Sequence, residues 1–247
     1  MLDVGFDFTD RQVVVTGGTG GTGLAIAHAF RAAGARVSVT GTKILPTLYD
    51  TDLAAFDYHQ LQLTSSDAID SFVERVGRVD VLVNAAGARL PGAVDEHERE
   101  FLVHSARLGF VGPQRLTQQL RPRLCASTVP GGGAVVHTSR VLAWYELALP
   151  PADAEAELRS HTTRAGRAWA RLGARVNTVL SPARTPVPRQ GRPPGASTAA
   201  AQGPGTLLTR HRTGASVSDA TSPVALFLAS QASAGLSGNT LVVAPPR

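Results

Sequence analysis

A run of glycines placed between a β-branched segment and a helical pattern constrains this chain more than any other feature. Residues 13–15 are three valines, and residues 16–23 (Thr-Gly-Gly-Thr-Gly-Gly-Thr-Gly) follow them at once. Apolar side chains then recur at helical spacing over 24–33, Gly34 ends that pattern, and a second strand is expected at 37–39. A strand, a glycine turn, a helix and a strand in this order are typical of a parallel α/β sheet.

The remaining sequence continues to alternate between short apolar runs and helical patterns. Further strands are expected at residues 61–63, 79–83, 133–138, 174–180 and 240–243, and helices at 67–76, 96–123, 153–172 and 221–230. Glycine and proline at 109–113 are expected to kink or restart the long helix. Because no repeat and no linker divides the chain, the sequence predicts one doubly wound, Rossmann-type domain over residues 1–247. Its parallel sheet of about seven strands would lie between two helical layers.

Composition excludes several classes of protein. Of the 247 residues, 43% are hydrophobic and 17% are charged, which is typical of a globular chain rather than a disordered one. No apolar stretch is long enough to span a membrane, and the chain begins with acids instead of the basic start of a secretory signal. The single cysteine, Cys125, cannot form an internal disulfide. We therefore expect a cytoplasmic protein without a membrane partner.

The positive charge does not by itself indicate a nucleic-acid partner. The formal net charge is +5, and the 24 basic residues comprise one lysine, Lys43, and arginines that are scattered along the chain. Scattered arginine together with abundant alanine, glycine and proline is typical of a GC-rich genome. We therefore expect a small-molecule substrate and no nucleic acid. His104, His161 and His211 share no metal-ligand spacing, so we expect no metal site.

Residues 181–216 interrupt the alternating pattern with six prolines and many glycines, serines and threonines. Such a segment cannot hold a long helix and is expected to be a surface loop. It follows the sixth strand, and ligands bind at the carboxyl ends of the strands in an open parallel sheet. This position favours a lid over a site, and the alternative is a disordered insertion.

The glycine turn has the chemistry of a phosphate site, because glycines let the backbone approach a diphosphate and the following helix points free N–H groups at it. Its arrangement, Thr16-Gly17-x-x-x-Gly21-x-Gly23, resembles the cofactor turn of the short-chain dehydrogenase/reductase family. The resemblance covers nearly the whole chain and implies that family's fold and an oxidoreductase ancestry. Further segments similar to the family's motifs are Asn-Ala-Ala-Gly at 84–87, Arg-Val-Asn-Thr-Val-Leu-Ser-Pro at 175–182, Leu-Phe-Leu-Ala-Ser at 226–230 and Leu-Ser-Gly-Asn-Thr-Leu at 236–241.

The resemblance implies a set of cofactor-binding residues: Thr16, Gly17, Thr19, Gly21, Thr22, Gly23, Thr42, Lys43, Gln62, Leu63, Asn84, Ala85, Ala86, Gly87 and Thr185. Family members specific for NAD usually carry an acid at the end of the second strand, whereas this chain has Thr-Gly-Thr-Lys at 40–43. Thr42 and Lys43 could hydrogen-bond a 2′-phosphate, so NADP(H) is favoured over NAD(H). The alternative is that Lys43 is only a solvated loop residue. Gln62 replaces the family's common aspartate near the adenine ring, and Thr185 resembles the threonine that holds the nicotinamide amide.

The resemblance breaks at the residues that carry the family's chemistry. The family uses a tyrosine as acid/base, a lysine in a Tyr-x-x-x-Lys pair that lowers the tyrosine pKa, a serine and an asparagine. Lowering the pKa of a phenol toward neutrality needs a nearby cation. Because Lys43 is the only lysine, this chain contains no such pair, and the usual hydride-transfer mechanism is not expected.

Other residues fall at the four catalytic places. They are Pro151 at the tyrosine place, Glu155 at the lysine place, Arg140 at the serine place with Ser139 before it, and Gly109 at the asparagine place. Arg140 and Glu155 occupy neighbouring places in the family's fold. A buried arginine–carboxylate pair is therefore expected, either as part of a rebuilt active site or as a structural plug.

Three function classes remain. The first is an enzyme with rebuilt chemistry, a reductase, cyclase, isomerase or dehydratase acting on a carbonyl-containing metabolite of a bacterial biosynthetic pathway. Its candidate catalytic residues are Arg140, Ser139, Tyr145 and Glu155, where Arg140 would polarise a carbonyl and Tyr145 or Glu155 would carry the proton. The second is a catalytically inactive partner subunit, and the third is a cofactor-sensing module. The family tendency implies a homodimer or homotetramer, or a paralogous subunit, joined through the helices at 96–123 and 153–172.

Overall fold

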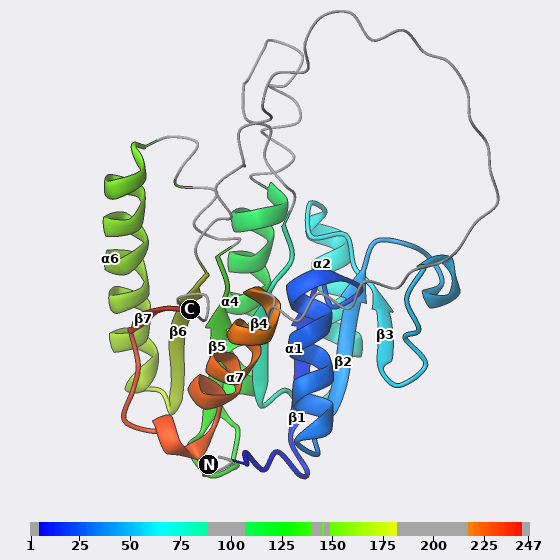
Figure 1. Ribbon diagram of the computed structural model, residues 1–247, viewed down its shortest axis with the longest axis horizontal. Helices are drawn as coiled ribbons and strands as arrows, with labels where there is room; N and C mark the ends of the chain where they lie inside the picture. Colours follow the sequence, from blue (N-terminus) through cyan, green and yellow to red (C-terminus); the bar gives the residue numbers. More distant parts are fainter. Residues whose placement is uncertain (1–4, 88–106, 140–144, 146–148, 182–216, 244–247) are drawn as a thin grey trace, which may run out of the picture.

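The computed structural model describes residues 5–87, 107–139, 145, 149–181 and 217–243, and their strands form one parallel sheet in the order β3-β2-β1-β4-β5-β6-β7 (Figure 1). The order reverses direction between β1 and β4, which is the switch point of a Rossmann-type sheet. The predicted fold class is therefore confirmed. The strands are β1 (Gln12–Thr16), β2 (Arg36–Gly41), β3 (Asp57–Gln60), β4 (Val81–Asn84), β5 (Gly133–His137), β6 (Ala174–Leu180) and β7 (Thr240–Val242).

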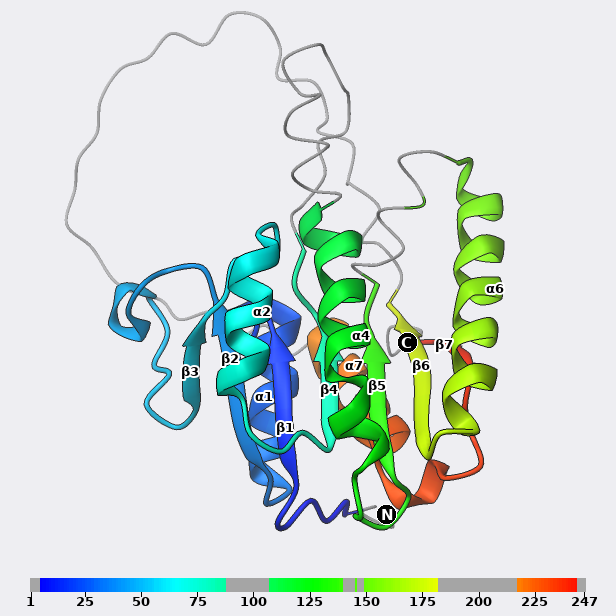
Figure 2. The ribbon, with the colours of Figure 1, turned by 180° about the vertical axis from the view of Figure 1, so that it is seen from behind.

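Helices cover both faces of the sheet. Figure 1 shows α1 (Gly21–Ala32) and α7 (Val217–Ala229) in front of it. The view from behind in Figure 2 shows α2 (Ser66–Arg75), α4 (Gly112–Cys125) and α6 (Pro151–Ala170) on the opposite face. Short helical turns connect these elements at η1 (Pro46–Leu48), η2 (Arg107–Val111) and η3 (Gln231–Ser233).

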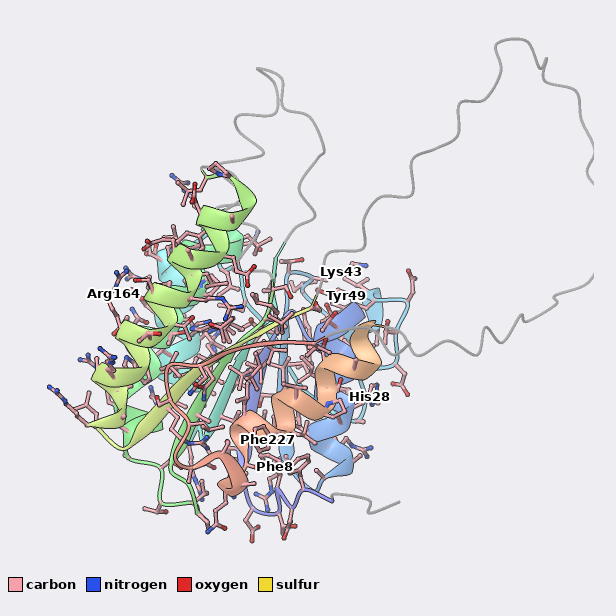
Figure 3. All side chains as sticks on the ribbon, turned by 60° about the vertical axis from the view of Figure 1, so that its left-hand side comes forward. Phe8, His28, Lys43, Tyr49, Arg164 and Phe227 are labelled. Carbon is pink, nitrogen blue, oxygen red and sulfur yellow. The ribbon has the colours of Figure 1, made fainter. Side chains whose placement is uncertain are left out.

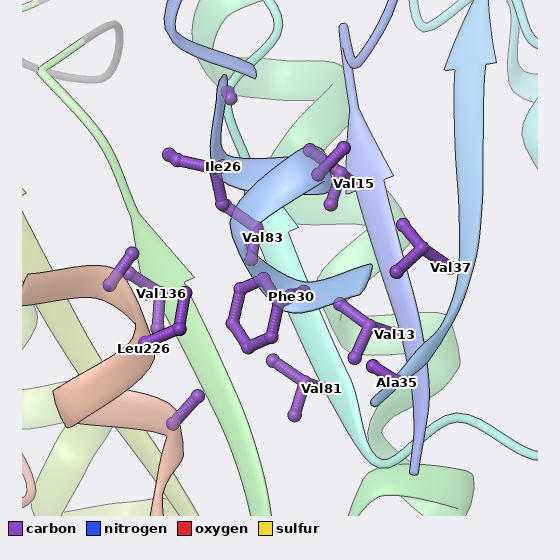
Figure 4. Close-up of a cluster of buried hydrophobic side chains, with 14 of the residues drawn as sticks. Val13, Val15, Ile26, Phe30, Ala35, Val37, Val81, Val83, Val136 and Leu226 are labelled. Carbon is purple, nitrogen blue, oxygen red and sulfur yellow. The ribbon is translucent and has the colours of Figure 1, made fainter. Parts of the chain in front are cut away.

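Each face of the sheet has its own hydrophobic core. Val13 and Val15 of β1 point toward α1, where they pack in one cluster with Ile26 and Phe30 (Figure 4). Val14 points to the opposite face and packs in a second cluster with side chains of α2 and α4. Burying one such side chain stabilises the fold by roughly 1.5–3 kcal/mol. A sheet buried on both faces explains the unbroken β-branched run in β1.

The strand predicted at 61–63 is wrong by several residues. The chain instead pairs with β2 over Asp57–Gln60. Leu61 and Leu63 are only 2% and 3% exposed. They are buried, but they belong to the connection between β3 and α2 and not to a strand. Burial of alternate apolar residues outside a strand produced the misleading pattern.

The first part of the predicted long helix, residues 96–106, lies outside the described residues. Where a kink or restart was expected, a π-helical turn spans Arg107–Val111, and α4 begins at Gly112. A Cβ atom on Gly112 would lie 2.0 Å from the carbonyl oxygen of Leu63, so only glycine permits this close approach. Within the described part of the chain, no helix combines the length and the apolar character needed to cross a membrane.

Candidate functional site

The start of α1 is open toward the carboxyl edge of the sheet. Its N-cap, Gly20, makes no side-chain cap hydrogen bond, and the first turn carries no acid. Cβ atoms built on Gly20 and Gly21 would meet no described atom within 4 Å. The first N–H groups of a helix have no partner inside the helix, and they carry the positive end of its dipole. This helix start can therefore receive an anion.

The glycine turn is packed too closely for side chains at two other positions. Gly17 has a φ of +64°, and a Cβ atom on it would lie 2.7 Å from the Cα of Ala86. A Cβ atom on Gly23 would lie 2.3 Å from the carbonyl oxygen of Gly17. The contacted atoms belong to the backbone, which has little freedom to move away. The turn after β1 and the turn after β4 thus form one compact backbone surface, which fits a diphosphate group.

Thr16 holds these two turns together. It is fully buried, and its hydroxyl accepts hydrogen bonds from the N–H groups of Ala85 (3.1 Å) and Ala86 (3.2 Å). The hydroxyl also lies 3.4 Å from the carbonyl oxygen of Val83, to which it donates. Its hydrogen-bonding capacity is used within the protein. Thr16 therefore positions the candidate site, while Thr19, Thr22 and Gly87 lie partly exposed around it.

Asn84 begins a buried polar network at the ends of β4 and β5. Its Nδ2 donates to Thr117 Oγ1 at 2.9 Å and lies 3.2 Å from Nδ1 of His137. Burial, followed by the charge of nearby His161, lowers the pKa of His137 to about 3, so this imidazole is neutral at pH 7. Because Nδ1 accepts from Asn84, the proton lies on Nε2. Within the described part of the chain, no donor reaches Oδ1 of Asn84.

The end of β2 carries the chain's only lysine. Lys43 is exposed, and its ammonium group donates to the carbonyl of Leu48 and lies 4.7 Å from the centre of the Tyr49 ring. Figure 3 shows Lys43 and Tyr49 side by side, at the end of the molecule opposite to Phe8. The carbonyl of neighbouring Thr42 accepts from Gln60 Nε2 at 3.1 Å.

Two predicted cofactor-binding residues follow β3. Gln62 is exposed at the surface, whereas Leu63 is 3% exposed and packs in the core behind the sheet. The side chain of Gln62 can thus reach a ligand, whereas the side chain of Leu63 is used in the core. Thr185 lies outside the described residues, as does the predicted lid from residue 182 on.

Ser139 is tied to the end of β6. Its Oγ accepts from the N–H of Ser181 at 2.7 Å and lies 2.8 Å from Oγ of the same residue. A further contact of 3.3 Å joins Ser139 Oγ to the carbonyl oxygen of Ser181. These bonds join the carboxyl ends of β5 and β6. The Ser139 hydroxyl therefore has a structural task in this arrangement.

Tyr145 lies in a small apolar cluster near the end of β6. It is 9% exposed, packs with Leu158 and Leu180, and meets Phe110 edge to face with ring centres 5.4 Å apart. Burial, and then the charge of Glu157, raise the pKa of Tyr145. The phenol is thus held in its protonated form, which suits a hydrogen-bond donor and not a base.

Glu155 does not occupy the buried position that was expected. It pairs with Arg159 one helical turn later, and the two side chains are 43% and 46% exposed. A carboxylate this exposed is partly solvated, so the expectation of a buried pair with Arg140 is wrong for Glu155. Arg140 itself lies outside the described residues. Among the described residues, no cluster of His, Cys, Asp and Glu could hold a metal ion.

The opposite edge of the sheet is filled by arginines that cap α7. Arg175 is 5% exposed and donates to the carbonyls of Leu228, Ala229 and Ser230. Arg11 donates to the same helix end, at the carbonyl of Ala229. A hollow of about 440 Å³ adjoins Arg11, but its guanidinium is already bound to protein carbonyls. The guanidinium groups of Arg11 and Arg175 are therefore used to cap the end of α7.

Comparison with known proteins assigns the family. The model of a family described as enoyl-(acyl carrier protein) reductase matches residues 17–244. The chain belongs to the short-chain dehydrogenase/reductase family. The resemblance carried by the glycine turn and by residues 84–87 is thereby confirmed.

Relatives within the short-chain dehydrogenase/reductase family are distant. Dehydrogenase/reductase SDR family member 7B of Danio rerio is 30% identical over 152 residues, which are 53% of this chain and 47% of the relative. A protein named as ketoacyl reductase 2 of the granaticin polyketide synthase of Streptomyces violaceoruber is 32% identical over 52% of this chain and 54% of its own length. The chain thus spans about half the length of these curated relatives.

Solved structures of short-chain dehydrogenase/reductase type share the fold over nearly the whole chain. A gluconate 5-dehydrogenase from Burkholderia cenocepacia, in complex with NADP and tartrate, has a TM-score of 0.68 at 24% identity and covers 97% of this chain and 96% of its own. The RhlG/NADP active-site complex of Pseudomonas aeruginosa has a TM-score of 0.69 at 19% identity, with 98% of each chain covered. At these identities the likeness supports the fold alone.

Two further residues that the sequence analysis assigned to the family's catalytic places are described. Pro151 is the first residue of α6, and Gly109 is buried inside the π-helical turn. Sequence reasoning missed Tyr49 and Tyr58, which lie beside Lys43. Their signal was weak, because two tyrosines in a connection and at an edge strand show no periodicity.

Proposed function

We propose that this chain is an NADP(H)-binding enzyme that reduces a small carbonyl-containing metabolite without the family's Tyr-x-x-x-Lys pair. The observation that carries the proposal is the uncapped start of α1 behind a glycine turn that has no room for side chains at Gly17 and Gly23. The only lysine of the chain lies just after the adjacent strand β2, where no acid stands. This combination suits a dinucleotide with an additional phosphate.

The residues divide into groups with separate tasks. The N–H groups at the start of α1, from Gly21 to Gly23, would hold the diphosphate, and Lys43 would meet the 2′-phosphate. Thr16 would keep the turns after β1 and β4 in register. The bound nicotinamide would supply the hydride to the substrate carbonyl.

A proton for the substrate oxygen requires a donor, and Tyr145 is the described side chain with suitable properties. Its raised pKa keeps the phenol protonated at neutral pH, so it can donate a hydrogen bond and then a proton. Tyr145 is therefore the proposed proton donor to the substrate oxygen. The names of relatives that are ketoacyl reductases agree with a β-keto thioester or a related ketone as substrate.

The test is consumption of NADPH with a panel of β-keto thioesters and cyclic ketones. We expect turnover with at least one ketone, and Tyr145→Phe should lower kcat by about tenfold to a hundredfold or more because the proton donor is lost. Tyr58→Phe is a matched control, since Tyr58 lies on β3 at the other end of the sheet order. Equal turnover of the Tyr145→Phe variant would contradict the role of Tyr145.

A nucleotide-binding subunit without turnover is the second candidate function. It is favoured by the internal pairing of Ser139 with Ser181 and of Glu155 with Arg159. The Ser139 hydroxyl and the Glu155 carboxylate are thus already bonded to other groups of the protein. Binding of NADPH without consumption across the whole panel would favour this candidate over the reductase.

A further inference from the structure

Tyr49 occupies the space that a side chain at position 41 would fill. Gly41 ends β2 and is buried. A Cβ atom built on Gly41 would lie 2.3 Å from Oη of Tyr49 and 2.7 Å from the methyl group of Thr19. The 3-10 turn η1 brings the tyrosine back to this point. Glycine at position 41 is thus explained by the phenol that lies against it.

The Tyr49 hydroxyl is the centre of a polar cluster between the glycine turn and the end of β2. It accepts from the N–H of Lys43 at 3.0 Å. Burial alone would raise the pKa of Tyr49, but hydrogen bonds with the Lys43 backbone and with the side chains of Tyr58, Thr42 and Thr19 bring it below the ordinary value. A phenol with a lowered pKa, as long as it keeps its proton, is a stronger hydrogen-bond donor to an anion.

The ring of Tyr49 also places the ammonium group of Lys43. The ammonium lies 4.7 Å from the ring centre and donates to the Leu48 carbonyl, so it is held on one face of the phenol. Tyr58 donates from β3 to the carbonyl of Lys43. Lys43 is thus fixed at both its backbone and its head, although it is exposed.

We propose that Tyr49 is a specificity-determining residue, which together with Lys43 forms a subsite for a phosphomonoester on the adenosine ribose. In dinucleotide sites of this fold, an acid at the end of the second strand takes the ribose 2′-hydroxyl, and a cation there accommodates a 2′-phosphate. Here the phenol of Tyr49 stands in the place of that acid. It offers an O–H donor without negative charge, and Lys43 adds the positive charge. The inference rests on the proposed function, since it requires a nucleotide at the glycine turn.

The test uses two nucleotides that lack nicotinamide, 2′,5′-ADP and 5′-ADP, each titrated calorimetrically into the folded full chain. We expect the wild-type chain to bind 2′,5′-ADP at least about tenfold more tightly, because the additional phosphate accepts charge-assisted hydrogen bonds. Tyr49→Phe keeps the ring under Lys43 and removes the hydroxyl. It should reduce the preference by about tenfold and leave 5′-ADP binding nearly unchanged. Tyr58→Phe removes the hydrogen bond to the Lys43 carbonyl but keeps the Tyr49 hydroxyl, so it should reduce the preference less than Tyr49→Phe does.

A second variant tests the same point if Tyr49→Phe does not fold. Gly41→Ala places a methyl group against the Tyr49 hydroxyl, which can swing outward because it is the end of a side chain. This variant should fold and lose the preference for 2′,5′-ADP. Wild-type preference in both variants would overturn the inference and leave the proposed function standing. Failure of the wild-type chain to bind either nucleotide or NADPH would overturn both.

Discussion

The two halves of the carboxyl edge differ in what builds them. Around β1 and β2, the surface consists of backbone: Gly17 and Gly23 lie against other backbone atoms, and the start of α1 is open. Around β5 and β6, the described polar side chains are bonded to one another, as Ser139 is to Ser181. The first half is shaped to receive a ligand, whereas in the second half the hydroxyls of Ser139 and Ser181 bind each other.

This difference shows which parts of an ancestral site can be lost without losing the fold. A glycine whose Cβ would lie 2.3 Å from a carbonyl oxygen cannot be replaced without moving the chain. A side chain at the surface, such as Glu155 with its partner Arg159, can change without moving the backbone. The nucleotide half is therefore the part in which the sequence pattern is most constrained.

The largest expected effect concerns the backbone surface of the nucleotide half. Gly23→Ala should destabilise the fold by about 3 kcal/mol and abolish measurable NADPH binding, because overpacking against backbone has no easy relief. Denaturant unfolding and calorimetry would measure both effects. Gly20→Ala is the matched control: its Cβ would meet no described atom, so its free energy of unfolding should stay within about 0.5 kcal/mol. Equal free energies of unfolding for Gly23→Ala and Gly20→Ala would contradict the claim that close backbone packing shapes the nucleotide half.

The second expected effect is a pH dependence that arises in the buried network of Asn84 and His137. The folded pKa of His137 is about 3, below the ordinary value of 6.5, so the unfolded chain binds its proton first. The contribution of this residue is complete above about pH 6.5 and is lost as the pH falls toward 3, at about 1.4 kcal/mol per pH unit. The lowered pKa of His161 acts in the same direction.

Replacing the buried histidine tests this pH dependence. His137→Gln should flatten the plot of unfolding free energy against pH between about pH 6 and pH 4. His28→Gln, a change at an exposed histidine of α1, should leave the slope as it is in the wild-type chain. An unchanged slope in the His137 variant would show that the imidazole is solvated in the native state.

A smaller effect is expected from the tie between β5 and β6. Ser139→Ala removes the acceptor for the Ser181 N–H and should lower the free energy of unfolding by about 1 kcal/mol. Ser181→Ala should show coupling with it in a double-mutant cycle, of about 0.5–1 kcal/mol, because the two hydroxyls lie 2.8 Å apart. Strict additivity would mean that Ser139 is available for a substrate.

The smallest effect is expected at Glu155. Glu155→Gln breaks a half-exposed pair with Arg159 and should cost less than about 0.5 kcal/mol. We also expect its kcat for a ketone substrate to equal that of the wild-type chain. A loss of turnover without a loss of stability would restore Glu155 as a catalytic residue and would weaken the contrast between the two halves.

The sequence predicted the parts of the molecule that depend on local pattern. Residues 12–39 gave β1, α1 and β2, since glycine conformations and apolar periodicity are local properties. The strand near 61–63 was misplaced because burial in a connection imitates a strand. The contact of Tyr49 with Gly41 was not predictable, since a connection brings them together without any periodic signal. The partner of Glu155 was a local i,i+4 arginine that the family comparison overlooked.

The most direct test of the account is a calorimetric titration of the wild-type chain with NADPH and with NADH under the same conditions. The account predicts micromolar binding of NADPH, weaker binding of NADH, and loss of both signals in Gly23→Ala. If neither nucleotide binds, the account is contradicted, and the backbone surface at the glycine turn is retained without a nucleotide-binding function.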